Sequence, residues 1–132
     1  MEQKIKDIYK SEKLEGDDPL VIWHNRIIEK NVDELTVSDV ARCFRQNLFL
    51  EIAYEMLLEY LLHNPYKGDY YEGELMDKAN EIENGYIKKH KDTIIKLIEN
   101  AHRFIETYEW ECEEDKDEYV RSVNRLANII NN

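Results

Sequence analysis

The sequence predicts an all-α fold, in which residues 1–132 form a single compact multi-helix domain of about six helices. Three observations support this prediction. The chain has only 4 Gly and 2 Pro, too few for the frequent turns of a β-sandwich or barrel. Apolar residues recur at helical spacing along most of the chain. Hydrophobic residues make up 42% of the 132 residues, enough to build a core without disulfide or metal staples.

Two helices are expected near the N-terminus. The first covers residues 3–13, where isoleucine and tyrosine side chains share one face. A stretch with Gly16 and two aspartates interrupts it. Asp18 can cap a second helix, over residues 20–30, and Pro19 suits the first turn of that helix.

A capping-box pattern and a long apolar run predict the next two helices. Thr36 and Asp39 are spaced so that each side chain can bond the other residue's backbone N–H at a helix start. We expect a kink or restart near Asn47. Residues 48–62 are the most apolar stretch of the chain and should form the central core helix.

Residues 63–73 read as the one long loop, because proline and two glycines interrupt the helical pattern there. An apolar stripe then predicts a helix over 75–86, which Asn84 and Gly85 can shorten. A further amphipathic helix is expected over 92–108. The chain closes with an acidic connector, 109–118, and a last helix, 117–130.

The formal net charge of −11, from 29 Asp+Glu against 18 Lys+Arg, narrows the classes of partner. Nucleic acid and anionic membrane are disfavoured because they carry the same sign of charge. Basic protein partners are favoured, although acidity for solubility alone explains the same charge. The chain shows no secretory signal and no run of 18 apolar residues. We therefore expect a cytoplasmic protein without a membrane segment.

No catalytic or metal-binding pattern is found, so the sequence predicts a protein that is not an enzyme and has no cofactor. The four histidines show no signature that joins them to Cys43 or Cys112. Two cysteines do not form a disulfide framework. Glu99 and His102 match the Glu-x-x-His spacing of helical di-iron sites once, whereas such sites need two copies. No phosphate-binding glycine motif exists.

The loop over residues 66–74 is the first candidate partner-binding segment, with three tyrosines and three carboxylates. Tyrosine supplies a large contact area at a small loss of side-chain freedom, so such loops suit protein recognition. The candidate contact residues are Asp69, Tyr71 and Glu72. The competing interpretation is a structural loop whose tyrosines fold back onto the core. It is favoured for Tyr66 and Tyr70 and stays open for Tyr71.

The second candidate segment is the acidic stretch 106–118, which holds eight acids and one lysine. An aromatic residue among carboxylates can anchor a basic partner, and the alternative is a solvated connector in which the tryptophan fills a helix junction. The candidate contact residues in this segment are Tyr108, Trp110, Glu111, Glu113 and Glu114.

The middle of the chain resembles a known family over about residues 20–85. The first matching block is a leucine-threonine-x-x-aspartate helix start followed by an arginine-glutamine pair. The second block is an asparagine-proline pair followed by glycine-aspartate-tyrosine-tyrosine-x-glycine-glutamate-leucine. In this sequence the matching residues are Leu35, Thr36, Asp39, Arg45, Gln46, Asn64, Pro65, Gly68, Asp69, Tyr70, Tyr71, Gly73, Glu74 and Leu75. Together these blocks resemble the helical immunity proteins of contact-dependent growth inhibition systems.

The resemblance implies a function that composition does not: stoichiometric inhibition of a cognate bacterial toxin domain, often a nuclease, by direct binding. It also favours a mainly structural role for the motif, in which Asp69 and Glu74 cap the following helix and Gly73 permits a tight turn. Toxin contact would then fall to variable acidic and aromatic positions nearby. The alternative function is a non-enzymatic helical adaptor or regulatory protein-binding module.

Overall fold

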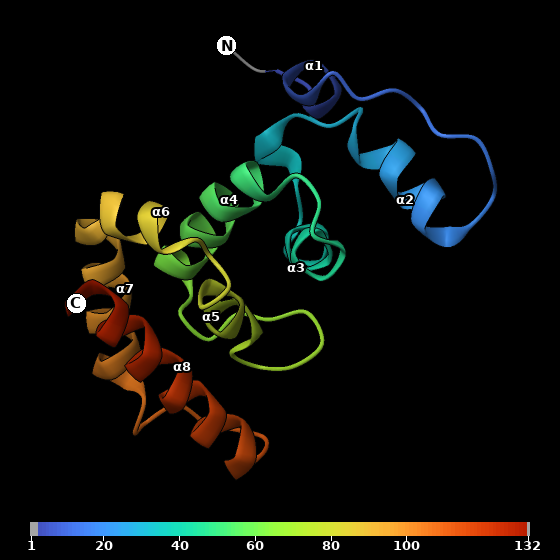
Figure 1. The fold of residues 1–132 in the computed structure, drawn as a ribbon. Coiled ribbons are helices and arrows are strands. Elements are labelled where there is room, and N and C mark those ends of the chain that lie inside the picture. The colour runs from blue at the N-terminus through green and yellow to red at the C-terminus, as the bar shows by residue number, and fades with distance from the viewer. Residues whose placement is uncertain (1–2, 132) are drawn as a thin grey trace.

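The computed structural model describes residues 3–131, and in that range the chain forms eight α-helices and one short 3-10 helix (Figure 1). The predicted all-α class is confirmed, whereas the predicted count of about six helices is too low. In chain order the elements are α1 (Ile5–Tyr9), α2 (Pro19–Ile27), η1 (Val32–Glu34), α3 (Val37–Gln46), α4 (Leu50–His63), α5 (Glu74–Ala79), α6 (Asn84–Lys89), α7 (Lys91–Phe104) and α8 (Glu113–Asn131).

The helix starts that the sequence marks most clearly are found where they are predicted. The Asp18 side chain accepts a hydrogen bond from the Leu20 N–H, and Pro19 is the first residue of α2. Thr36 and Asp39 form the capping box of α3, with the Asp39 N–H donating to Thr36 Oγ1 over 3.1 Å. These side chains satisfy N–H groups that would otherwise lack a partner at a helix start.

The expected restart near Asn47 is also confirmed. Asn47 has a φ of 53° and ends α3, and Phe49 has a φ of 53° just before α4 begins. Two residues in the left-handed region turn the chain sharply within three positions. This turn folds α4 back against α3.

Several predicted boundaries are wrong, among them the end of α7, which lies at Phe104 rather than at 108. The first helix covers only Ile5–Tyr9 rather than 3–13, because Lys10 adopts a left-handed φ of 54°. The stripe over 75–86 is not one helix. It breaks at residues 80–83, where the Asn80 side chain bonds the Ser122 carbonyl of α8. The last helix begins at Glu113, so part of the predicted connector is helical.

Helix α4 is the centre of the packing, as its apolar sequence predicts. It contacts α3, η1, α5 and α7, and α8 closes the other side of the core against α5, α6 and α7 (Figure 1). Leu57 and Leu61 of α4 are fully buried, together with Leu75 of α5 and Leu97 of α7. Replacing one of these leucines with alanine would cost about 2–5 kcal/mol of stability.

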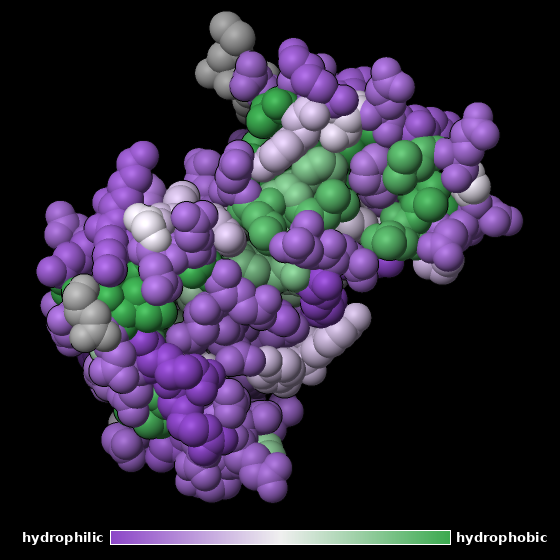
Figure 2. All heavy atoms as spheres, viewed as in Figure 1, coloured by the Kyte–Doolittle hydropathy of each residue, from purple (hydrophilic) through white to green (hydrophobic). Residues whose placement is uncertain are grey.

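The two ends of the molecule have different surfaces. Figure 2 shows apolar side chains over α2 and beside α4, whereas the surface around α8 is mainly hydrophilic. Leu20 and Ile22 of α2 are among the exposed large apolar residues. In Figure 1 the start of α8 lies at the opposite end from α1 and α2, and the loop before α5 lies between them, next to α3.

Candidate functional site

The loop between α4 and α5 is held in shape by one buried carboxylate. The Glu74 side chain is 2% exposed, and its Oε1 accepts hydrogen bonds from the Asp69 N–H over 2.9 Å and the Tyr70 N–H over 2.8 Å. The Gly73 N–H donates to the Tyr66 carbonyl across the base of the loop. Glu74 therefore orders the loop that precedes it and does not cap α5.

Arg45 of α3 joins this loop to the body of the protein. Its guanidinium donates to Asp69 Oδ2 over 2.8 Å and to Glu74 Oε2 over 3.2 Å. It also lies 3.6 Å from the centre of the Tyr70 ring. Burial alone would lower the pKa of Arg45, but the two carboxylates outweigh burial and raise it. Asp69 is thus an ion-pair partner of Arg45. The expectation that Asp69 and Glu74 cap α5 is wrong, because neither side chain bonds the N-terminus of that helix.

The glycines of the motif are required by close packing. Gly73 has a φ of 82°, and a Cβ added there would lie 2.7 Å from the ring of buried Tyr119. A Cβ at Gly68 would lie 1.8 Å from the Tyr71 carbonyl oxygen. The tight turn predicted at Gly73 is confirmed, and this part of the motif serves the fold.

An aromatic cluster lies behind the loop and joins it to the acidic segment before α8. Tyr66 stacks on Tyr108 with 4.2 Å between ring centres, and Trp110 contacts both rings. Tyr119 of α8 completes the cluster and donates a hydrogen bond to the Pro65 carbonyl over 2.8 Å. Trp110 therefore fills the junction between loop and helix, as the structural interpretation of this segment predicts.

Glu72 makes the direct link between the two segments that the sequence singles out. Its carboxylate accepts hydrogen bonds from the Tyr108 hydroxyl and from the Glu111 N–H. Burial and the bond to Glu72 raise the pKa of Tyr108 to about 12. Residues 72 and 111 are far apart in sequence, so the bond brings the loop and the acidic segment together in one surface.

A depression of about 320 Å³ lies at this junction. Its lining includes five of the predicted contact residues, namely Asp69, Tyr71, Glu72, Tyr108 and Glu111. Tyr71 is only partly available, because its hydroxyl donates to Asp77 over 2.7 Å. Glu113 and Glu114 are exposed in the first turn of α8 next to the connector. Trp110 does not line the depression.

Sequence reasoning misses two residues of this site. Tyr70 is expected to fold back onto the core, yet it is 75% exposed and lines the depression. Arg45 is not expected to reach the loop at all. The arginine-glutamine pair of the family motif is the one sequence signal that points to Arg45. The expectation for Tyr66 is right, because that side chain is 6% exposed and its hydroxyl donates to the Ala101 carbonyl.

A second polar cluster, centred on Asp39, serves the fold of the N-terminal half. Its buried carboxylate accepts hydrogen bonds from Trp23, Arg26, Lys30 and the Thr36 N–H. Burial alone would raise the pKa of Asp39, but the bonds from Lys30, Thr36 and Trp23 outweigh burial and hold the pKa below its usual range. These hydrogen bonds to Asp39 come from α2, from the turn that follows α2 and from the start of α3. The Asp39 cluster therefore ties these elements together.

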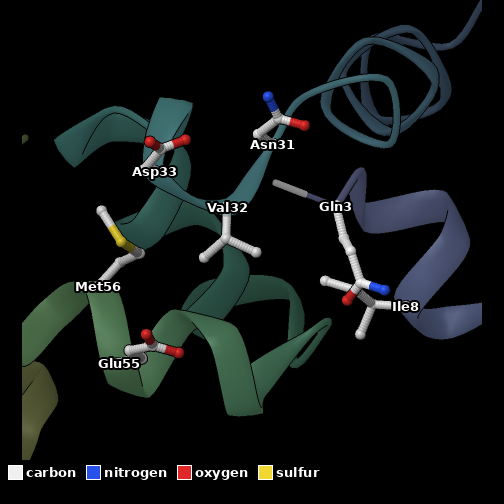
Figure 3. A pocket seen from close by; sticks show the side chains of 7 residues that line it. All are labelled: Gln3, Ile8, Asn31, Val32, Asp33, Glu55 and Met56. Atoms are coloured by element: carbon white, nitrogen blue, oxygen red, sulfur yellow. The ribbon is translucent and has the colours of Figure 1, made fainter. Parts of the chain in front are cut away.

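A smaller concavity, of about 270 Å³, lies beside α1, η1 and α4 (Figure 3). Ile8, Val32 and Met56 form its apolar lining, and Asp33 and Glu55 add two carboxylates to the lining. None of the predicted contact residues lines it. Within residues 3–131, no group of three or more His, Cys, Asp or Glu side chains is placed to hold a metal ion.

The comparison with protein families identifies the class to which this all-helical chain belongs. A model of CDI (contact-dependent growth inhibition) immunity proteins matches residues 4–97. The chain therefore belongs to the family of CDI immunity proteins, which confirms the resemblance drawn from its motifs. Membership implies an immunity function exerted on a cognate toxin protein. A search of curated proteins found no match.

The matched range divides the candidate site. The loop and Arg45 lie within residues 4–97, whereas Tyr108, Trp110 and Glu111 lie beyond them. The depression is thus built from a family segment on one side and from a segment outside the family model on the other. Among residues 3–131, no helix combines the length and apolar character needed to cross a bilayer.

Proposed function

We propose that this protein binds and inactivates its cognate toxin domain in the cytoplasm by stoichiometric inhibition, and that the toxin docks on the surface formed by the loop and the acidic segment before α8. One observation carries the choice of surface. The bonds from Tyr108 and Glu111 to Glu72 unite the two segments that the concentration of tyrosine and carboxylate singles out in the sequence.

Charge indicates the kind of toxin surface that fits. Glu111, Glu113 and Glu114 are exposed, and their carboxylates form no ion pair within residues 3–131. A toxin that cleaves nucleic acid needs a basic face for its substrate. We therefore propose that the toxin is a nuclease and that this acidic surface covers its basic face and blocks access of the substrate.

The first experiment is co-expression of the protein with the toxin domain encoded beside it. Survival of the cells and co-purification of the two chains in equal amounts would support stoichiometric immunity. Cell death, or failure of the folded toxin to bind, would refute it.

The proposed surface is tested by charge reversal. The triple variant Glu111→Lys, Glu113→Lys, Glu114→Lys should slow association by about 10-fold or more at low ionic strength, and by less at high salt. The matched control reverses Glu12, Glu15 and Asp17, which are exposed residues before α2. Both variants change the net charge equally, so equal association rates would show that the position of these acids does not matter.

A further inference from the structure

We propose that Tyr70 is the principal aromatic anchor of the toxin interface, that it receives a basic side chain of the toxin, and that Arg45 is the positioning residue that holds it in place. This inference rests on the proposed function and makes it specific. It assigns to Tyr70 the anchoring role that the sequence alone places on Tyr71, Tyr108 and Trp110.

The exposure of Tyr70 sets it apart from the other aromatic residues of the site. At 75%, it is the most exposed large apolar side chain among residues 3–131, ahead of Ile22 at 57% and Phe104 at 53%. Trp110 is packed into the aromatic cluster. Tyr71 is tied to Asp77. The Tyr70 hydroxyl has no hydrogen bond within the described range. Tyrosine is one of the residue types enriched among interface positions that contribute most to binding, and Tyr70 offers an unburied ring that a partner can cover.

Tyr70 is exposed but not free to move. Glu74 accepts a hydrogen bond from its backbone N–H over 2.8 Å, and the Arg45 guanidinium lies 3.6 Å from its ring centre. Arg45 is itself fixed by Asp69 and Glu74. The ring thus has a fixed base and one covered face before any partner arrives, so little side-chain freedom is lost when a partner packs against it.

The surroundings of Tyr70 favour a cation on its open face. The face of an aromatic ring attracts guanidinium and ammonium groups. The charge of Asp69 is already balanced by Arg45. Lys67, Glu72 and Glu111 line the same depression and form no ion pair within residues 3–131, so the two carboxylates outweigh the one lysine. An arginine or lysine of the toxin would therefore stack on Tyr70 and direct its charge toward these two carboxylates.

Affinity measurements with the purified toxin domain test the anchor. Tyr70→Ala should raise Kd by at least about 30-fold, the size of effect that marks a dominant interface residue. Tyr70→Phe, which keeps the ring, should change Kd by less than about 3-fold. Phe104→Ala and Ile22→Ala, at the next most exposed apolar positions, serve as matched controls and should leave Kd unchanged.

A double-mutant cycle tests the role of Arg45. Arg45→Met should raise Kd by about 10-fold when Tyr70 is present, and should have no further effect when Tyr70 is alanine. An equal effect of Arg45→Met in both backgrounds would show a general structural role and would overturn the positioning assignment. Circular dichroism and urea unfolding confirm that each variant is folded.

The outcomes separate this inference from the proposed function. If the unaltered protein binds the toxin and Tyr70→Ala binds equally well, the anchor is refuted while the immunity function stands. If Ile22→Ala weakens binding instead, the interface lies at the α2 end and the inference is refuted. Failure of the unaltered protein to bind would overturn both.

Discussion

Glu74→Gln is the sharpest test of how the loop is ordered. Glutamine has nearly the same shape as glutamate, and its amide oxygen can still accept the Asp69 and Tyr70 N–H groups. Its amide NH₂ would instead face the Arg45 guanidinium, which now lies 3.2 Å from Glu74 Oε2. The substitution therefore replaces one charged hydrogen bond with two opposed donors and weakens the other two.

The size of the effect follows from these contacts. A hydrogen bond to a charged group contributes about 1.5–3 kcal/mol, and Arg45 keeps Asp69 as a partner. We expect Glu74→Gln to lower the free energy of unfolding by about 2 kcal/mol, which is roughly 8 °C in Tm for a protein of this size. Glu74→Ala removes all three bonds and should cost about 3–5 kcal/mol.

Urea unfolding at pH 7 gives the free energies, and amide hydrogen exchange reports on the loop itself. The Asp69 and Tyr70 amides should exchange faster in Glu74→Gln than in the unaltered protein. Glu59→Gln, at an exposed position of α4, is the matched control and should stay within about 0.5 kcal/mol. If Glu74→Gln is as stable as this control, the buried carboxylate does not hold the loop and the reasoning fails.

Three further predictions follow from buried groups. The lowered pKa of Asp39 contributes stability that is fully present above the pKa of an unfolded aspartate, about 4, and is lost as pH falls through the native pKa. The free energy of unfolding of Asp39→Asn should therefore differ less from that of the unaltered protein at pH 2 than at pH 5. A difference that stays constant with pH in urea unfolding would contradict this. Gly73→Ala should cost about 2–5 kcal/mol, from left-handed strain and from contact with Tyr119. The control is Gly85→Ala, whose added Cβ would lie 3.6 Å from the Glu83 side chain, an ordinary contact, and it should be within about 1 kcal/mol of neutral in the same assay. In the native protein only the exposed thiol of Cys112 should react with a thiol reagent, whereas both thiols should react in denaturant. The reason is that Cys43 is buried and burial raises its pKa to about 12. Reaction of both thiols without denaturant would show that the core around Cys43 opens.

The sequence predicts helix starts better than helix continuity. Thr36 and Asp39 mark the start of α3 because capping is local and depends on side-chain types a few residues apart. The stripe Leu75, Ala79, Ile82 and Tyr86 identifies a face that packs on the core, since the first three are buried and Tyr86 is partly buried against that core. It does not reveal the break after Ala79, because at that point Asn80 bonds the carbonyl of Ser122, a residue 42 positions further along the chain.

The same limit applies to the candidate site. Composition identifies the loop and the acidic segment, since a concentration of tyrosine and carboxylate is visible in a short window. Their union through Glu72, and the reach of Arg45 to Asp69, are tertiary contacts. With 29 acids and 18 bases in the chain, a great many ion pairs are possible, and only the packing of α3 against the loop selects this one.

The placement of the two tryptophans provides each half of the protein with its own optical reporter. Trp23 is buried in α2, where its indole N–H donates to Asp39, while Trp110 sits among three tyrosine rings about 5 Å away. Excitation of tyrosine will therefore transfer energy to Trp110 in the folded protein. Trp23→Phe and Trp110→Phe isolate the two emission signals. Because α4 packs against both α3 and α7, we expect the two emission signals to report the same urea midpoint. In a binding experiment, a change in Trp110 emission on addition of the toxin can be compared with the emission of Trp23, which lies away from the proposed interface.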